Sequence, residues 1–173
     1  MTCQRGHGTC DVPRVLSRLT RAVTGPQQLH FAGALVMYRW ARRAYRAVVA
    51  TPDAPKAIGP YSQAVRANGF LFVSGMIGFV PETMELASKS DVKLQTEQAL
   101  KNMVNVLRAG GSNPDKVVKT TVLMTDMDNY KVINEVYAKF FTKDFPARAA
   151  FAVKALPANA LVEIECVAMC EED

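Results

Sequence analysis

The sequence predicts an α+β domain in which two amphipathic helices pack on one face of a mixed β-sheet. Two segments place apolar residues at helical spacing, and short segments rich in β-branched and aromatic residues surround them. The order of these segments is βββαβαββ, in which each helix is followed by a strand. A sheet with both helices on one face accommodates this order.

The predicted strands are short runs of β-branched, aromatic and aliphatic residues. They lie at 44–50, 63–67, 70–74, 116–124, 149–154 and 161–169. The last strand alternates, so one face carries Val162, Ile164, Cys166 and Ala168. The other face carries Leu161, Glu163, Glu165 and Val167. We expect the first set to lie under the helices.

Each predicted helix has an apolar stripe and a start or stop signal. The first helix lies within 94–111 and stops at a Gly-Gly pair. Its stripe consists of Leu100, Met103, Val104 and Leu107. The second lies within 128–141 and has Asp126 or Asp128 as N-cap. Its stripe consists of Tyr130, Ile133, Tyr137 and Phe140, whose aromatic members we expect in the core.

The carboxylates of Glu163 and Glu165 are expected on the sheet face that the helices leave uncovered. On so apolar a strand, two carboxylates need either water or a partner molecule. An oligomer that brings the sheets of several subunits together would cover this face in part and leave clefts where a charge is useful. We therefore expect an oligomer.

The N-terminal segment differs in charge from the rest of the chain. Residues 1–50 contain eight arginines, no lysine and one acid, Asp11, whereas residues 51–173 carry 13 basic and 15 acidic side chains. An Arg-rich, acid-poor start is typical of mitochondrial transit peptides. We expect a leader at 1–43 that directs a domain at 44–173 to the mitochondrial matrix. The alternatives are a disordered extension of a cytoplasmic protein, or translation from Met37.

Membrane and nucleic-acid partners are not expected. The longest uncharged apolar stretch in the leader, 31–38, is far shorter than a bilayer-spanning helix. The basic surplus lies in the leader, so the domain offers no basic track for a phosphate backbone.

Several kinds of catalytic site are excluded from the domain by its composition. Both histidines, His7 and His30, lie in the leader, which removes histidine-dependent triads and metal sites. The domain has no glycine-rich phosphate loop or dinucleotide fingerprint. The four cysteines have neither disulfide-framework nor metal-binding spacing. We expect neither a cofactor nor a metal ion.

Six ordered blocks between about residues 47 and 170 resemble the RidA/YjgF family of reactive-intermediate deaminases. They are IGPYSQAV (58–65), FVSG (72–75), VVKTTVLMTDM (117–127), NEVYAKFF (134–141), FPARAAF (145–151) and ALPANALVEIECVA (155–168). The resemblance implies a chorismate-mutase-like fold and a homotrimer with active sites between subunits. It also implies cofactor-independent hydrolysis of 2-imino acids or enamines, such as 2-iminobutanoate and 2-iminopropanoate, to 2-oxo acids and ammonia.

Two charged residues match the catalytic pair that the resemblance implies. Arg148 would bind the substrate carboxylate, because a guanidinium offers it two parallel donors. Glu163 would direct water at the imine carbon and pass a proton to the departing ammonia. Glu165 is the alternative carboxylate. Without the family match, Arg148 would be interpreted as half of a surface salt bridge.

The resemblance further implies a substrate-binding set. It consists of Tyr61, Ser74, Gly75, Asn134 and Ala150. Tyr61 would supply an apolar wall and a hydroxyl group. Ser74 and Gly75 would line the pocket and offer a backbone N–H, while Asn134 takes a polar pocket position. The carbonyl of Ala150 would hold the water together with Glu163.

Three residues depart from the family pattern. Met76 replaces a glutamine, which removes polar support unless the residue packs in the core. Met84 replaces a turn glycine at a position that suits positive φ, so we expect that loop to be strained or rebuilt. Ala150 replaces a cysteine of some bacterial members and keeps the backbone carbonyl.

Two other functions are compatible with the same resemblance. One is an endoribonuclease that inhibits translation, although a domain without histidine and with net negative charge is poorly suited to it. The other is a trimeric ligand-binding or chaperone-like protein that uses the same clefts. The presence of both Arg148 and Glu163 favours catalysis.

Overall fold

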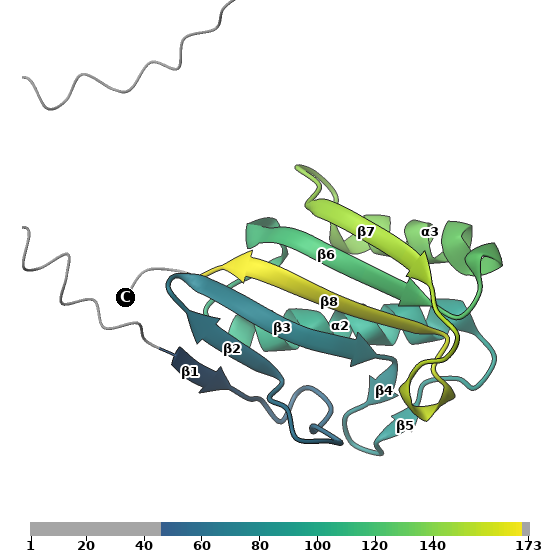
Figure 1. Ribbon diagram of the computed structural model, residues 1–173, viewed down its shortest axis with the longest axis horizontal. Coiled ribbons are helices and arrows are strands. Elements are labelled where there is room, and N and C mark those ends of the chain that lie inside the picture. Colours follow the sequence, from purple (N-terminus) through teal and green to yellow (C-terminus); the bar gives the residue numbers. More distant parts are fainter. Residues whose placement is uncertain (1–45, 171–173) are drawn as a thin grey trace, which may run out of the picture. The chain divides into compact units, whose positions relative to one another are not determined.

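A six-stranded sheet organises residues 46–170, the part of the chain that this computed structural model describes (Figure 1). The predicted leader at 1–43 lies outside the described residues. The strands and helices are β1 (Arg46–Val49), β2 (Ala64–Ala67), β3 (Phe70–Ile77), β4 (Phe79–Val80), β5 (Glu85–Leu86), α2 (Val92–Ala109), β6 (Val117–Met124), α3 (Tyr130–Phe140), β7 (Ala147–Ala152) and β8 (Val162–Met169). Short 3₁₀ turns lie at Pro114–Lys116, Met127–Asn129 and Pro157–Asn159.

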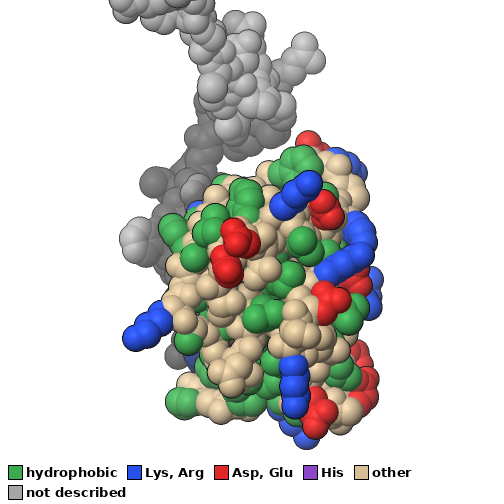
Figure 2. Space-filling model, turned by 90° about the vertical axis from the view of Figure 1, so that its right-hand side faces the viewer, with side chains coloured by type: hydrophobic (Ala, Val, Ile, Leu, Met, Phe, Trp, Pro, Cys, Tyr) green, Lys and Arg blue, Asp and Glu red, His purple; other side chains and the backbone are tan. Residues whose placement is uncertain are grey.

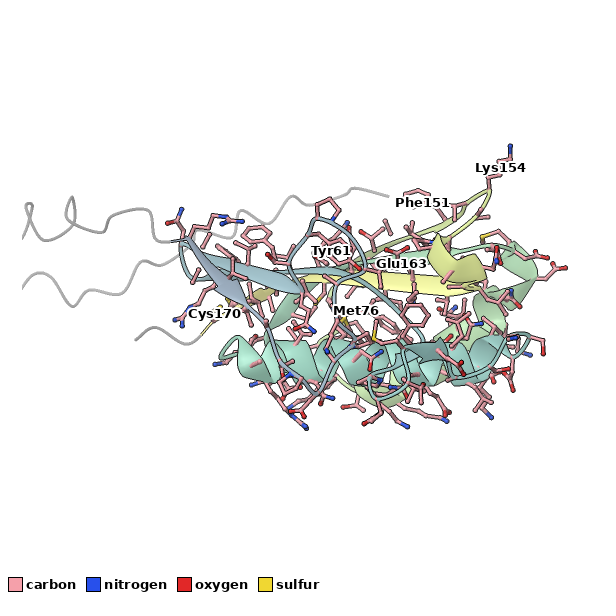
Figure 3. All side chains as sticks on the ribbon, turned by 90° about the horizontal axis from the view of Figure 1, so that it is seen from below. Tyr61, Met76, Phe151, Lys154, Glu163 and Cys170 are labelled. Atoms are coloured by element: carbon pink, nitrogen blue, oxygen red, sulfur yellow. The ribbon has the colours of Figure 1, made fainter. Side chains whose placement is uncertain are left out.

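The sheet is mixed, with strand order β1-β2-β3-β8-β6-β7. All neighbours are antiparallel except β6 and β7, which are parallel. Both helices lie on one face of the sheet, as Figure 3 shows with the helices below it. The predicted α+β fold is therefore confirmed. Neither helix of residues 46–170 is long and apolar enough to cross a membrane.

The alternation predicted for the last strand is confirmed in β8. Val162, Ile164, Cys166 and Ala168 are all buried in the main hydrophobic core. They pack with the buried face of α2, which includes Leu100, Met103, Val106 and Leu107. Glu163 is half-buried and Glu165 exposed on the opposite face. The helices thus leave the carboxylate-bearing face of the sheet open.

The first helix differs from the prediction at its start and in its stripe. The Asp91 carboxylate accepts hydrogen bonds from the backbone N–H groups of Lys93 (2.8 Å) and Leu94 (3.2 Å), so α2 starts at Val92. Val104, predicted in the stripe, is only half-buried, and Val106 takes the core position. The reason is that the core-facing side of α2 is broad and includes buried polar residues, which an apolar pattern does not register.

The predictions at the start of the second helix were partly wrong. Asp126 accepts from the N–H of Asp128 (2.9 Å) and so caps the preceding 3₁₀ turn, whereas the N-cap of α3 is Asn129, without a side-chain cap bond. Tyr130 is 38% exposed and therefore not a core residue. As the first residue of α3, it contacts Arg148 on β7 instead of the core. Tyr137 is buried, as predicted.

The segment after β3 holds a feature that the pattern did not predict. β3 continues to Ile77, and a short hairpin of β4 and β5 follows. Met84 lies in the hairpin turn with φ of 58°, in the left-handed region that favours glycine. Its N–H still donates to the Val80 carbonyl (2.8 Å). The turn therefore keeps its shape and is strained, which is one of the two outcomes expected there.

Candidate active site

Arg148 lies in a pocket between β7 and α3. It is paired with Thr120 in the register of β6 and β7, so its side chain leaves the sheet on the helix-covered side. Its Nη2 donates to the hydroxyl oxygen of Tyr130 at 3.1 Å. Its guanidinium carbon lies 4.9 Å from the ring centre of Tyr137 and 5.6 Å from that of Tyr130. Two aromatic faces of one helix thus support the cation.

A buried hydrogen bond holds the ring of Tyr137 in place. The hydroxyl groups of Tyr137 and Thr120 are 2.8 Å apart, and Thr120 is fully buried beside Arg148. Phe141 stacks on the Tyr137 ring with 4.4 Å between ring centres. Burial raises the pKa of Tyr137, so the ring stays neutral beneath the guanidinium. The support of Arg148 is therefore rigid on this side.

Asn134 completes the Arg148 pocket. It lies one turn after Tyr130 on α3, and a hydrogen bond from Asn134 lowers the pKa of the Tyr130 hydroxyl, with the positive charge of Arg148 as a further cause. The pocket is about 330 Å³ and its remaining lining comes from Tyr137, Ala138, Phe145 and Pro146. The structure thus brings together two of the predicted residues, Arg148 and Asn134.

The salt-bridge interpretation of Arg148 finds no acid to support it. Neither Arg148 nor Glu163 forms an ion pair with any residue in 46–170. A guanidinium whose only hydrogen bond within residues 46–170 goes to a phenol keeps donors for an external anion.

A second cavity, of about 210 Å³, contains four of the predicted residues. These are Tyr61, Ser74, Gly75 and Glu163. The rest of its wall is mainly apolar, from residues that include Ile58, Met76, Phe79 and Pro157, with Lys56 as a charged member. Figure 3 shows Tyr61 and Glu163 close together above the sheet, on the side away from the helices.

A β-bulge in β3 shapes this cavity. Val73 pairs with Cys166 and Met76 with Ile164, so two residues of β3, Ser74 and Gly75, oppose the single residue between them on β8. The Glu163 side chain lies directly over Gly75, where an added Cβ would overlap its carboxylate. Gly75 therefore provides the space that Glu163 occupies.

Internal hydrogen bonds fix the other walls of the Glu163 cavity. The Ser74 hydroxyl donates to the Ser62 carbonyl (2.7 Å), and the Ser74 N–H donates to the Gln63 carbonyl (3.0 Å), so this N–H is not available to a substrate. The Tyr61 hydroxyl accepts from the Ile58 N–H at 3.2 Å. The amide of buried Gln63 bonds the backbone of Thr51, Ala54 and Pro55, which fixes the loop around Pro55.

The environment of Glu163 favours its protonated form more than water does. Burial is the main cause that raises the pKa of Glu163, and the nearby charge of Glu165 raises it further. Such a carboxyl can exchange a proton closer to neutral pH than a solvated glutamate can. Glu165 is exposed and is not among the residues that line the Glu163 cavity.

The Arg148 pocket and the Glu163 cavity lie apart within one chain. Glu163 pairs with Leu123, which pairs with Phe151, on the open face; Arg148 is on the helix-covered face. Ala150 pairs with Val122, which pairs with Ile164, and packs on the core, so it is not beside Glu163. The predicted residues therefore form two separate groups in the described chain.

Some residues around Arg148 and Glu163 were not predicted from the sequence. Tyr130 and Tyr137 were assigned to the core, although their spacing with Asn134 (i, i+4, i+7) puts all three on one helix face. No sequence pattern indicated the four hydrogen bonds between the Gln63 amide and the loop at 51–55. Met76 is buried in the core and also lines the Glu163 cavity, which favours the packing alternative for this departure.

Comparison with known proteins gives the family of the chain. Residues 51–170 match the model of the Endoribonuclease L-PSP family. A chloroplastic Reactive Intermediate Deaminase A of Arabidopsis thaliana is 51% identical over 121 residues, which are 70% of this chain and 64% of that protein. A human 2-iminobutanoate/2-iminopropanoate deaminase is 47% identical over 124 residues, 72% of this chain and 90% of that protein.

Solved structures agree with this result. A crystal structure described as a putative endoribonuclease L-PSP from Entamoeba histolytica superposes with a TM-score of 0.70 at 46% identity, over 72% of this chain and 99% of that one. The YjgF gene product of Escherichia coli gives 0.68 at 37% identity, over the same shares of the two chains. The chain belongs to the Endoribonuclease L-PSP family, the RidA/YjgF family that the six sequence blocks predicted.

Proposed function

We propose that this protein is a homotrimeric deaminase that hydrolyses 2-imino acids and their enamine tautomers, with Arg148 and Glu163 of neighbouring subunits in one site. The observation that carries the proposal is the pair of complementary half-sites. Arg148 has donors for a carboxylate and no acidic partner within residues 46–170, while Glu163 is a half-buried carboxylate without a cation partner there. The Arabidopsis and human relatives are named as deaminases of this kind.

The substrate carboxylate binds at Arg148. A 2-imino acid carries its carboxylate directly on the C=N carbon, so a fixed carboxylate also fixes the reacting carbon. Two parallel N–H groups of a guanidinium hold both carboxylate oxygens, which gives position as well as affinity. Asn134 lies in the same pocket and offers a further polar contact.

Glu163 supplies the proton transfers. Its carboxylate takes a proton from water as the water oxygen bonds to the protonated imine carbon, which forms a tetrahedral aminoalcohol. Glu163 then returns the proton to the nitrogen. The C–N bond breaks as the hydroxyl oxygen forms the new carbonyl and releases its proton, so the products are a 2-oxo acid and ammonium. The raised pKa of Glu163 suits both transfers. Neither transfer calls for a metal or cofactor.

The other predicted residues shape the site around this reaction. Tyr61, Ser74 and Gly75 enclose the Glu163 side chain in a mainly apolar cavity that accepts the substrate side chain. The Ala150 carbonyl of the neighbouring subunit holds the water together with Glu163. This role depends on assembly, because β7 and β8 are separated by β6 in one chain.

The open face of the sheet is the proposed subunit interface. Phe70, Phe72 and Met169 lie on it, on the same side as Glu163, and each is at least 40% exposed. Exposed aromatic residues on the sheet face that also carries half of a site are typical of oligomer interfaces. A trimer would cover these residues and bring β7 of one subunit near the Glu163 cavity of the next.

Residues 1–43 are proposed as an organelle-targeting leader, mitochondrial by its arginine content. The name of the Arabidopsis relative places that protein in the chloroplast. A fluorescent reporter fused to residues 1–50 should enter mitochondria. A diffuse cytosolic signal would contradict the proposal.

A coupled assay tests the activity. An amino-acid dehydratase or oxidase generates the imino acid in situ, and its lifetime is measured with and without the protein. We expect the imino acid to disappear faster when the protein is present, with one 2-oxo acid formed for each imino acid consumed. Because the family name includes endoribonuclease, RNA is assayed in parallel; RNA cleavage without imine hydrolysis would reverse the proposal. In the view of Figure 2, basic and acidic side chains are intermingled, which does not favour a phosphate backbone.

A further inference from the structure

The Tyr130 hydroxyl lies beside the guanidinium of Arg148. Its oxygen is 3.1 Å from Nη2 of Arg148, and its side chain is partly exposed to solvent. The other tyrosine of the pocket, Tyr137, is buried, and its hydroxyl is already bonded to Thr120. Of the two phenols around the guanidinium, the exposed hydroxyl of Tyr130 is therefore the better placed to contact a bound ligand.

The bonding of Tyr130 leaves its proton free to donate. Arg148 donates to the hydroxyl oxygen at 3.1 Å. A phenol oxygen that accepts hydrogen bonds keeps its own O–H as a donor. Within residues 46–170 no carboxylate or carbonyl is recorded as acceptor for that proton. The O–H and the remaining N–H groups of Arg148 therefore form a cluster of donors.

We propose that the Tyr130 hydroxyl is a second donor to the substrate carboxylate, beside Arg148. The inference rests on the proposed function, because it takes the carboxylate of a 2-imino acid as the ligand. A carboxylate has about four lone-pair sites and can accept from the guanidinium and the phenol together. Tyr130 thereby selects for ligands that carry this anion, whereas the apolar Glu163 cavity selects the side chain.

Tyr130→Phe isolates the hydroxyl, because it keeps the ring that lies against the guanidinium. A hydrogen bond to a charged group is worth roughly tenfold or more in affinity. We expect about a tenfold rise in KM for the imino acid and in Kd for 2-oxobutanoate, with kcat within about twofold of wild type. A change in KM alone indicates binding that is equal in ground and transition states. Lys131→Ala, the exposed neighbour on α3, is the matched control and should change neither constant.

The same substitution in an Arg148→Lys background separates direct contact from positioning. If Tyr130 touches the carboxylate, Tyr130→Phe should weaken 2-oxobutanoate binding by about as much with lysine at position 148 as with arginine. If the hydroxyl only orients the guanidinium, its effect should vanish in that background, and the proposal is overturned. Unchanged binding of 2-oxobutanoate by Tyr130→Phe alone would overturn it as well.

The outcomes also separate this inference from the proposed function. If the wild-type protein hydrolyses the imino acid and Tyr130→Phe has the same KM and Kd, the proposed function stands and the role of Tyr130 is rejected. Wild-type protein that binds 2-oxobutanoate but hydrolyses no imino acid rejects the function, and the binding comparison still decides on Tyr130. Wild-type protein that neither hydrolyses the imino acid nor binds 2-oxobutanoate rejects both.

Discussion

Arg148 and Glu163 point to opposite faces of the same sheet. Through Thr120, Arg148 aligns with Cys166 on β8, and Glu163 lies three positions before Cys166 on that strand. Side chains alternate along a strand, so an odd separation places them on opposite faces. If both residues act on one substrate, they belong to different subunits.

This geometry predicts that two inactive variants restore each other's activity. Arg148→Lys and Glu163→Gln should each be nearly inactive alone. The two variants are co-expressed at equal levels to form mixed trimers. A site is intact when a Glu163→Gln subunit supplies its arginine and an Arg148→Lys subunit supplies its glutamate. Random mixing makes this true for about one site in four. We expect about a quarter of wild-type kcat/KM in the coupled assay.

The control for this experiment is a mixture of the two purified variants that has not exchanged subunits. It should stay inactive. A mixed preparation with no activity above the single variants would place both residues in one subunit, or exclude one of them from the site.

Arg148→Lys should reduce kcat/KM by roughly one to two decades while the trimer persists. Lysine keeps the charge but loses one of two parallel hydrogen bonds, and such charged bonds contribute about 1.5–3 kcal/mol. A surface ion pair would contribute only about 0–1 kcal/mol. Activity is measured in the coupled assay, and light scattering gives the mass. Activity within threefold of wild type would show that the arginine has no carboxylate-binding role.

The strand alternation and the helical stripes predicted most of the fold because burial decides both. Val162, Ile164 and Cys166 had to face the helices once β8 was recognised as a strand. The short hairpin of β4 and β5 was not predicted, since two-residue strands carry no periodicity. The one indication from the sequence was Met84, which stands at a position that suits a glycine and therefore a positive φ.

The site was predictable in its residue types but not in its arrangement. The motif match named Arg148 and Glu163, and strand alternation placed Glu163 on the open face. The face of Arg148 depends on the pairing of β7 with β6, which the sequence pattern did not specify. The stripe that contains Tyr130 correctly predicted a helix. It could not show that the first turn of this helix lies against Arg148 at the sheet edge.

Gly75→Ala should abolish activity without unfolding the protein. The added methyl group would overlap the Glu163 carboxylate, which is the end of a flexible side chain and can move away. We expect a large fall in kcat and nearly unchanged melting temperature.

Gly78→Ala provides the contrast to this variant. There the methyl group would lie 2.7 Å from the backbone Cα of Gln95 in α2, which cannot move without shifting the helix. It should lower the melting temperature strongly. Equal destabilisation by Gly75→Ala and Gly78→Ala would contradict the role assigned to Gly75.

The strained turn at Met84 predicts an unusual order of stability. Met84→Gly and Met84→Ala both remove the side chain, which packs partly on a small cluster that contains Phe79. Alanine keeps the strain of positive φ, worth about 1–2 kcal/mol, and glycine relieves it at a cost of about 0.4–1 kcal/mol in unfolded-state entropy. We expect Met84→Gly to be the more stable of the two by about 1 kcal/mol in urea unfolding. The reverse order would show that the turn is not strained.

Glu163→Gln should separate catalysis from stability. Catalysis needs the ionised carboxylate as proton acceptor, so wild-type kcat/KM should fall as pH drops through a Glu163 pKa that lies above its usual value of 4.5. Glutamine should lower kcat much more than it changes 2-oxobutanoate binding, because it keeps the shape and removes the proton acceptor.

Stability should change in the opposite direction. Because the folded-state pKa is raised, the folded protein binds this proton more tightly than the unfolded chain does. The contribution of Glu163 is therefore most favourable below pH 4.5 and is lost as pH rises through the folded pKa. At pH 7, Glu163→Gln removes a half-buried charge that Glu165 repels. Chemical denaturation from pH 4 to 8 should show that the free energy of unfolding of the variant increases relative to that of wild type as pH rises. A constant difference would mean that Glu163 ionises as readily in the folded protein as in water.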